Sequence, residues 1–123
     1  MKRTILLAIG LNLLVSAGTG CSRSGGSSTA STPEEAVPAM QSTFENASTD
    51  VKQEVEGAVT AITSQNDEAA YEHLENLSQQ ELNEEQREAM RAAQRAVIAR
   101  IAAEATNGNA AAEALMNRYR SSK

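Results

Sequence analysis

Few side chains in this sequence could carry nucleophilic or metal chemistry. One cysteine, Cys21, and one histidine, His73, occur among its 123 residues. Nucleophilic catalysis needs a serine or cysteine beside a base, and His73 is the only imidazole that could act as one. A metal site on a helix would place a second ligand three or four residues from the histidine, where the chain has Ala69, Ala70, Asn76 and Leu77. We therefore interpret His73 as a surface residue and expect no metal and no other cofactor.

Other catalytic signatures are also absent from the sequence. It contains no Gly-x-Ser-x-Gly or Ser-x-x-Lys motif and no glycine-rich phosphate loop followed by a helix. Pairs of carboxylates are common, but a solvated acidic helix face produces such pairs by default, and no tryptophan accompanies them as a sugar platform. The sequence therefore predicts a protein without enzymatic activity.

The first twenty-one residues have the pattern of an export signal. Lys2 and Arg3 form a basic start, residues 5–17 are mostly apolar, and small residues lead into Cys21. A secretory signal combines these three parts in this order. A permanent membrane span would need about 20 apolar residues, so we favour an export signal over an uncleaved anchor.

This arrangement resembles the signals of bacterial lipoproteins, in which signal peptidase II cuts before a cysteine that then carries lipid. The resemblance covers residues 1–21 and implies removal of residues 1–20 and lipidation of Cys21 with diacylglycerol and an N-acyl chain. Gly18 departs from the usual Leu-Ala-Gly-Cys pattern, which has a larger aliphatic residue there. The alternative is cleavage by an ordinary signal peptidase, which would leave a free thiol on a secreted or periplasmic soluble protein. A lone exported thiol is open to oxidation, which favours acylation.

The resemblance also implies a location. Two or three acyl chains such as palmitate hold a protein stably on a membrane without a spanning helix. In enteric members of the family, a residue other than Asp after the cysteine implies passage to the outer membrane, and Ser22 occupies that position. We expect a protein of the cell envelope, anchored in the outer membrane and facing the periplasm.

Composition divides the rest of the chain into a tether and one domain. From residue 21 onward the chain has 9 basic and 16 acidic residues, a net charge of −7, which disfavours binding to nucleic acid. About 100 residues suffice for one domain. We expect a lipidated cysteine with a Gly/Ser-rich tether over residues 21–31, an all-α domain over 32–120, and a short tail over 121–123.

Capping signals and apolar periodicity predict the helices. Thr32, Pro33 and Glu35 form the pattern of an N-cap, an N1 proline and a capping box. An apolar stripe follows with steps of three or four residues: Val37, Met40, Phe44, Ala47, Val51, Val55, Ala58 and Ile62. Pro38 and the polar residues 46–50 are its weak points. The stripe therefore fits one long kinked helix or two shorter helices, the second capped by Asp50 with Gln53.

Three more helices are expected after this stripe. The turn at residues 64–67 should cap a helix over 67–80, and Asn83 with Gln86 should cap the clearest helix, 84–106, which Asn107-Gly108 ends. Asn109 can cap a last short helix that ends near Arg120. Their predicted buried positions are Ala70, Tyr71, Leu74, Leu77, Leu82, Met90, Ala93, Val97, Ile98, Ile101, Ala105, Ala112, Leu115, Met116 and Tyr119.

Short turns between helices favour antiparallel neighbours. We expect an all-α domain, either a small antiparallel bundle or a helical-hairpin array of three to four helices. Residues 58–77 resemble one helical hairpin of the tetratricopeptide-like repeats, without the repeat's usual Trp, Gly and Pro. The resemblance implies a hairpin and no peptide groove. The stripe over residues 37–62 is long enough for an intermolecular, coiled-coil-like contact, so a homo-oligomer is possible.

Charge is divided unevenly between the two halves of the expected domain. Residues 34–85 contain 13 acidic residues and one basic residue, a net charge of −12, whereas residues 86–123 have a net charge of +4. Two helix faces show the division as a glutamate stripe (Glu68, Glu72, Glu75) and an arginine stripe (Arg87, Arg91, Arg95). We expect the stripes to pair, each exposed pair contributing about 0 to 1 kcal/mol. The alternative is that the arginine stripe binds an anionic ligand, such as a polysaccharide or a lipid head group.

The C-terminus is basic and ends in Lys123. A lipid-anchored helical protein that ends in this way is similar to the murein lipoprotein of enteric bacteria, whose last lysine is joined to peptidoglycan. The resemblance implies attachment through Lys123, although residues 84–120 lack sustained heptads and Ser121-Ser122 intervene. The sequence thus predicts a non-enzymatic envelope lipoprotein, a helical spacer or a module that interacts with an unidentified envelope protein. The alternatives are a membrane-to-peptidoglycan tether and a weak anion binder.

Overall fold

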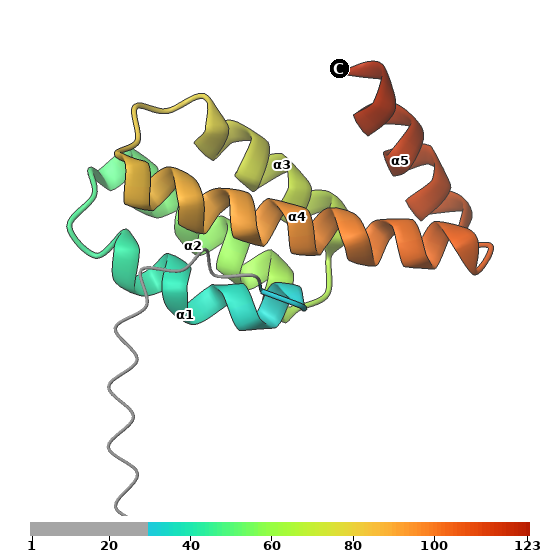
Figure 1. Ribbon diagram of the computed structural model, residues 1–123, viewed down its shortest axis with the longest axis horizontal. Coiled ribbons are helices and arrows are strands. Elements are labelled where there is room, and N and C mark those ends of the chain that lie inside the picture. Colours follow the sequence, from blue (N-terminus) through green and yellow to red (C-terminus); the bar gives the residue numbers. More distant parts are fainter. Residues whose placement is uncertain (1–29) are drawn as a thin grey trace, which may run out of the picture.

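Residues 30–123, the part of the chain that the computed structural model describes, form five helices (Figure 1). They are α1 (Pro33–Thr43), α2 (Thr49–Thr63), α3 (Asp67–Ser78), α4 (Glu84–Thr106) and α5 (Ala110–Ser121). The all-α class is confirmed, with one helix more than the three to four expected. The predicted signal, Cys21 and the tether up to residue 29 lie outside the described residues.

Helices α1 to α4 form an antiparallel bundle. Each packs against the next along the chain, and α1 also packs against α4, which closes the ring (Figure 1). Turns of three to five residues join them, as the sequence predicted for antiparallel neighbours. The fifth helix, α5, packs mainly against α4 and leaves the bundle at the far end of that helix.

Ala30 and Ser31, which we expected to belong to the tether, contact the folded domain. The capping box at the start of α1 is present, because Thr32 accepts from the amide of Glu35 and the Glu35 carboxylate accepts from the amide of Thr32. That carboxylate also accepts from the amide of Ser31 at 2.8 Å, and Ala30 packs partly against the core. Residues 30 and 31 therefore belong to the folded domain and not to a free tether.

The first apolar stripe is divided between two helices. The division falls at residues 44–48 and not at Pro38, which lies inside α1. Phe44 ends α1 as a buried C-cap residue. The predicted cap at Asp50 is wrong: α2 begins after Ser48, and Asp50 lies in its first turn, where its charge still favours the helix N-terminus.

The remaining boundaries follow the predicted caps. Asn66 accepts from the amide of Ala69, Asn83 forms a capping box with Gln86, and Asn109 accepts from two amides of α5. Gly108 has φ of +88°, as expected for the residue that ends α4 in a left-handed turn. Two helix ends differ: α3 ends at Ser78 instead of residue 80, and α5 ends at Ser121, one residue into the expected tail.

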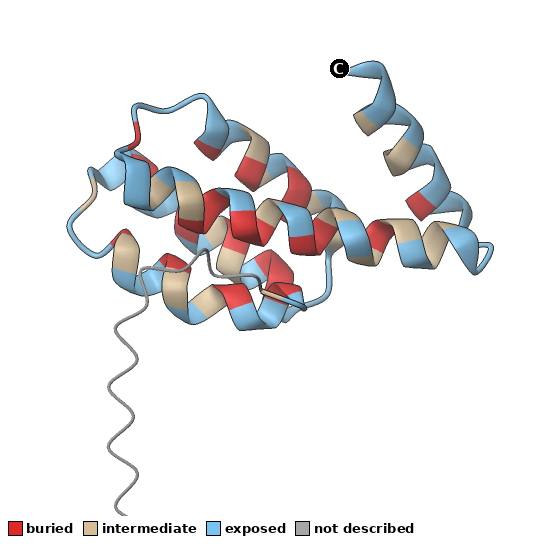
Figure 2. Cartoon of the chain, in the orientation of Figure 1, coloured by how far each residue is buried: buried red, intermediate tan, exposed pale blue. Residues whose placement is uncertain are grey.

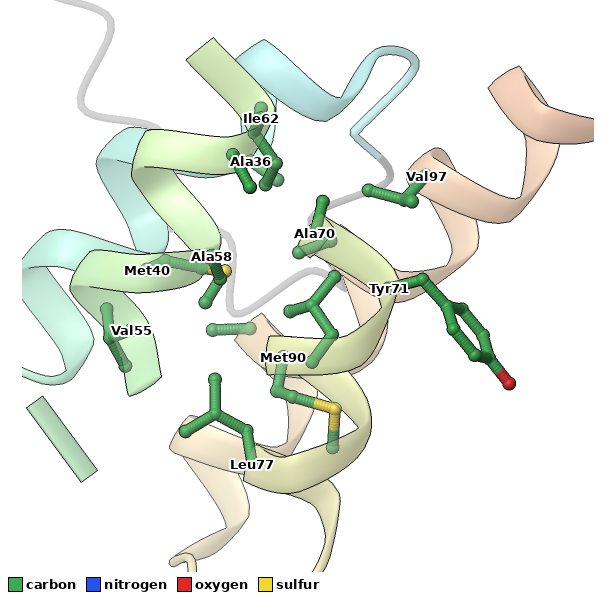
Figure 3. Packing of buried hydrophobic residues seen from close by; sticks show 14 of the residues in the cluster. Ala36, Met40, Val55, Ala58, Ile62, Ala70, Tyr71, Leu77, Met90 and Val97 are labelled. Atoms are coloured by element: carbon green, nitrogen blue, oxygen red, sulfur yellow. The ribbon is translucent and has the colours of Figure 1, made fainter. Parts of the chain in front are cut away.

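The predicted stripes supply the core (Figures 2 and 3). Met40, Ala58 and Leu77 point into a shared interior between the helices, together with Met90 from α4 (Figure 3). The side chains that are buried most completely are Met40, Phe44, Ile62, Leu74, Leu77, Val97 and Ile101. Because the stripe over residues 37–62 turns inward, it is not available for the intermolecular contact that we considered.

Candidate interaction surfaces

The apolar face of α5 is covered less completely than that of the other helices. Ala112 is its only buried residue, whereas Leu115, Met116 and Tyr119 are half-buried against the core. Asn107, Gly108 and Asn109 form the turn that sets this position, with Asn109 capping α5 and donating to Glu104 at 3.2 Å. The first turn of α5 is thus capped and partly buried, whereas the rest of the helix is intermediate or exposed (Figure 2).

A groove of about 640 Å³ lies between α5, the start of α3 and the second half of α4. Its apolar lining comes from Ile101, Ala112 and Leu115, and its polar lining includes the carboxylates of Glu68 and Glu104. The other lining residues are Ser64, Gln65, Asn66, Asp67, Asn109, Ala111, Ala114 and Arg118. An apolar base with an acidic rim suits a basic amphipathic segment better than an anionic one.

Two tyrosines connect α5 to α3. The rings of Tyr71 and Tyr119 meet edge to face, with centroids 6.2 Å apart and planes at 88°. The Nζ atom of Lys123 lies 4.7 Å from the centroid of the Tyr119 ring. The last lysine therefore rests on α5, and its exposed position leaves the amine open to solvent on its other side.

The most buried ion pair of the described residues, Arg100 with Asp67, belongs to a cluster that joins three helices. Arg100 of α4 donates to Asp67, at the start of α3, through Nε at 2.7 Å and also through Nη2, and it donates to Glu34 of α1 through Nη1 at 2.5 Å. The side chains of Arg100 and Asp67 are only 20% and 10% exposed. This arrangement fixes the starts of α1 and α3 to one side of α4, next to the groove.

The pKa values of Glu34 and Arg100 shift in the direction of stronger ion pairing. A hydrogen bond from its own backbone amide lowers the pKa of Glu34 most; burial acts to raise it, and the hydrogen bond and charge of Arg100 lower it further. Partial burial acts to lower the pKa of Arg100, but its hydrogen bonds to Asp67 and Glu34 outweigh burial and raise it. Both groups therefore stay charged over a wider pH range than in an unfolded chain.

A second polar cluster joins α2 to α3. Nδ1 of His73 lies 2.8 Å from a carboxylate oxygen of Glu54. The same oxygen accepts a hydrogen bond from Nδ2 of the Asn76 side chain at 3.4 Å. The imidazole lies against Gly57, where the Cβ atom of any larger residue would be 2.5 Å from Cε1 of the ring. His73 is thus partly exposed, as expected, but it has a defined place in the α2–α3 packing that the sequence did not reveal.

The arginine stripe does not pair with the glutamate stripe. Arg87 pairs with Glu84 at 3.1 Å and Arg95 with Glu88 at 3.6 Å, both within α4, and Arg91 forms no ion pair within residues 30–123. The expectation was wrong because the three arginines lie on the outer face of α4, opposite buried residues such as Ala93 and Val97. Arg100 forms the interhelical ion pairs instead. The sequence indicates its inward position, because Arg100 directly precedes buried Ile101 and follows buried Val97 by three residues, which places it beside the buried face of α4.

Two kinds of site were not found in residues 30–123. No group of three or more His, Cys, Asp or Glu side chains in this part of the chain is arranged to hold a metal ion. None of its helices has both the length and the apolar composition needed to cross a bilayer. In comparisons with known proteins, no family model, no curated protein and no solved structure matches the chain.

Proposed function

We propose that the chain is a non-enzymatic lipoprotein of the cell envelope whose helical domain acts as a spacer or protein-interaction module. The observation that carries this proposal is the position of Cys21, the only cysteine, directly after small residues at the end of an export-signal pattern. Ala30 and Ser31 already contact the folded domain, so at most eight residues separate this cysteine from it. A Gly/Ser-rich chain of that length typically spans about 15 Å, which would hold the domain close to the membrane surface.

Palmitate labelling in a bacterial host tests the anchor. We expect the wild-type chain to take up labelled palmitate and its precursor to accumulate in the presence of globomycin, which inhibits signal peptidase II. Cys21→Ser should abolish both effects, whereas Ser22→Ala, the neighbouring control, should leave them unchanged. Unaltered processing of Cys21→Ser would contradict the lipid anchor and favour ordinary secretion.

The folded domain supports an interaction role more than a catalytic one. The base candidate, His73, lies against the carboxylate of Glu54 on the α2–α3 surface, and the other candidate, Cys21, lies outside the described residues. The open features of the domain are instead surfaces, namely the groove beside α5 and the outer face of α4. Such surfaces are typical of proteins that act by contact.

The exposed arginine stripe favours a second candidate function, the binding of an anionic ligand. Its three guanidinium groups point outward along α4, and Arg91 forms no ion pair within the described chain. We expect heparin, used as a polyanionic probe, to bind the wild-type chain at about 50 mM salt and to bind Arg91→Glu much more weakly. Lys52→Glu, which makes the same change of charge at an exposed position of α2, is the control. Equal binding by wild-type and Arg91→Glu would exclude this function.

Attachment to peptidoglycan through Lys123 is the third candidate. Lys123 follows α5 and is exposed, as an attachment point must be. If this candidate is correct, digested cell walls should contain muropeptides linked to the C-terminal peptide, and deletion of Lys123 should remove them. Arg120→Gln, which lowers the same local charge, should leave the linkage intact.

A further inference from the structure

The groove side of α5 is only partly covered within the described chain. Leu115 is half-buried at the base of the groove, and Ala111 and Ala114 on the same side of α5 are exposed. Helices α1 to α4 bury their apolar stripes in the common core, so α5 is the exception (Figure 2). A half-covered apolar face beside a groove with a polar rim is typical of an interaction site.

The charges around α5 identify the occupant that the groove fits. The carboxylates of Glu68 and Glu104 line the groove near the beginning of α5. Arg118 lines it near the end of the helix. A second α5 that lay antiparallel in the groove would bring its basic end beside the acidic beginning of the first. A twofold relation forms every such contact twice.

We infer that α5 of a second copy of this chain packs antiparallel into the groove beside α5, which makes a twofold-symmetric pair. The exposed alanines let the two helices approach closely, and Leu115 of each copy covers the apolar base of the other groove. A helix of 12 residues is about 18 Å long, so the interface is small and the pair exchanges readily. This inference rests on the interaction role in the proposed function and is independent of the lipid anchor.

Disulfide cross-linking of the full-length chain tests the pair. Ala114 lies near the middle of the groove side of α5, so the twofold axis brings Ala114 of one copy close to Ala114 of the other. Ala114→Cys should therefore form a disulfide-linked dimer in whole cells treated with copper phenanthroline, whether or not the chain is anchored in a membrane. Asn117→Cys is the matched control, because residue 117 is exposed on the same helix but does not line the groove. We expect at least a fivefold lower dimer yield for Asn117→Cys.

The wild-type chain serves as a second control, because its only thiol is Cys21. A wild-type dimer would report a free Cys21 and contradict lipidation, whereas a dimer specific to Ala114→Cys reports the α5 pair. The two proposals can thus fail separately. Equal yields for both variants, or no dimer from an Ala114→Cys chain with wild-type circular dichroism, would overturn the inference. So would a heterologous cross-linked band in place of the dimer, which would assign the groove to another protein.

Charge reversal gives a test that needs no cysteine. In sedimentation equilibrium of the purified full-length chain, Arg118→Glu should weaken self-association about tenfold, since the twofold axis repeats the loss. Adding Glu68→Lys on the opposite wall should restore most of it. A wild-type chain that stays monomeric at about 200 μM, or a double variant no tighter than the single one, would refute antiparallel pairing.

Discussion

Replacing Arg100 with methionine measures how much the three-helix ion-pair cluster contributes to stability. Methionine retains most of the apolar stem and removes the donors, so Asp67 loses its partner while being only 10% exposed. A hydrogen bond to a charged group contributes about 1.5 to 3 kcal/mol, and an exposed ion pair about 0 to 1 kcal/mol. Arg100, at 20% exposure, lies between these cases. We expect the free energy of unfolding to fall by about 2 kcal/mol.

Urea denaturation followed by circular dichroism at 222 nm provides the measurement. Arg95→Met is the matched control: it lies on the same helix, is 57% exposed, and approaches Glu88 only to 3.6 Å. Its free energy of unfolding should change by less than about 0.5 kcal/mol. A double-mutant cycle of Arg100→Met with Asp67→Ala should give a coupling energy of about 1 to 2 kcal/mol.

Two results would refute this reasoning. One is a free energy of unfolding for Arg100→Met that equals that of Arg95→Met within error. The other is a coupling energy near zero, which would mean that Arg100 and Asp67 act independently. Either result would assign the cohesion between the starts of α1, α3 and α4 to apolar packing alone.

Three further predictions concern the same fold. The lowered pKa of Glu34 contributes stability that is fully present above pH 4.5, the ordinary value, and is lost as the pH falls through the lower value of the folded state. Glu34→Gln should therefore lose less stability than wild type between about pH 5 and 3. Acid titrations followed by circular dichroism provide the measurement. Gly57→Ala should destabilise the domain by about 1 kcal/mol, because displacing His73 outweighs the better helix propensity of alanine. In a His73→Ala background the same change should stabilise the domain by up to about 1 kcal/mol. Stabilisation in both backgrounds would contradict the close contact. Leu74→Ala, in the core, should lower the free energy of unfolding measured by urea denaturation by about 2 to 5 kcal/mol. Leu115→Ala, on α5, should lower it by less than half as much. Equal losses would show that α5 is part of the core.

Local signals made most of the fold predictable from the sequence. A cap such as Asn83 or Asn109 acts within three residues, so its effect on a helix start is visible in the sequence alone. Apolar periodicity also identified the inward positions, because a bundle buries one face of each helix. The division between α1 and α2 was left open, since both arrangements bury the same stripe and only the packing of Phe44 at the end of α1 decides between them.

Contacts between distant residues could not be predicted in the same way. Arg100 meets partners 33 and 66 positions away, and its choice over Arg87, Arg91 and Arg95 depends on the rotation of α4 in the bundle. Gly57 is a weak helix former by local rules, and only the imidazole of His73 on the next helix explains it. The groove beside α5 depends on the angle at which that helix leaves α4, which no local signal determines.

Because the arginine stripe points outward, it leaves the acidic side chains of α1–α3 largely unpaired, and both proposed binding surfaces depend on charges that face solvent. Within residues 30–123, Arg100 is the only cation of α4 whose ion pairs reach another helix, so most acidic side chains of α1–α3 stay solvated. At 0.15 M salt, charges interact over only about 8 Å, so they matter in direct contact. An anion on the arginine stripe has no apolar contribution to retain it, whereas the groove has the half-buried Leu115 and the exposed Ala111 and Ala114. Raising the salt should therefore release heparin from α4 at concentrations that leave the α5 pair largely intact, and simultaneous loss of both would mean that α5 contributes charge alone.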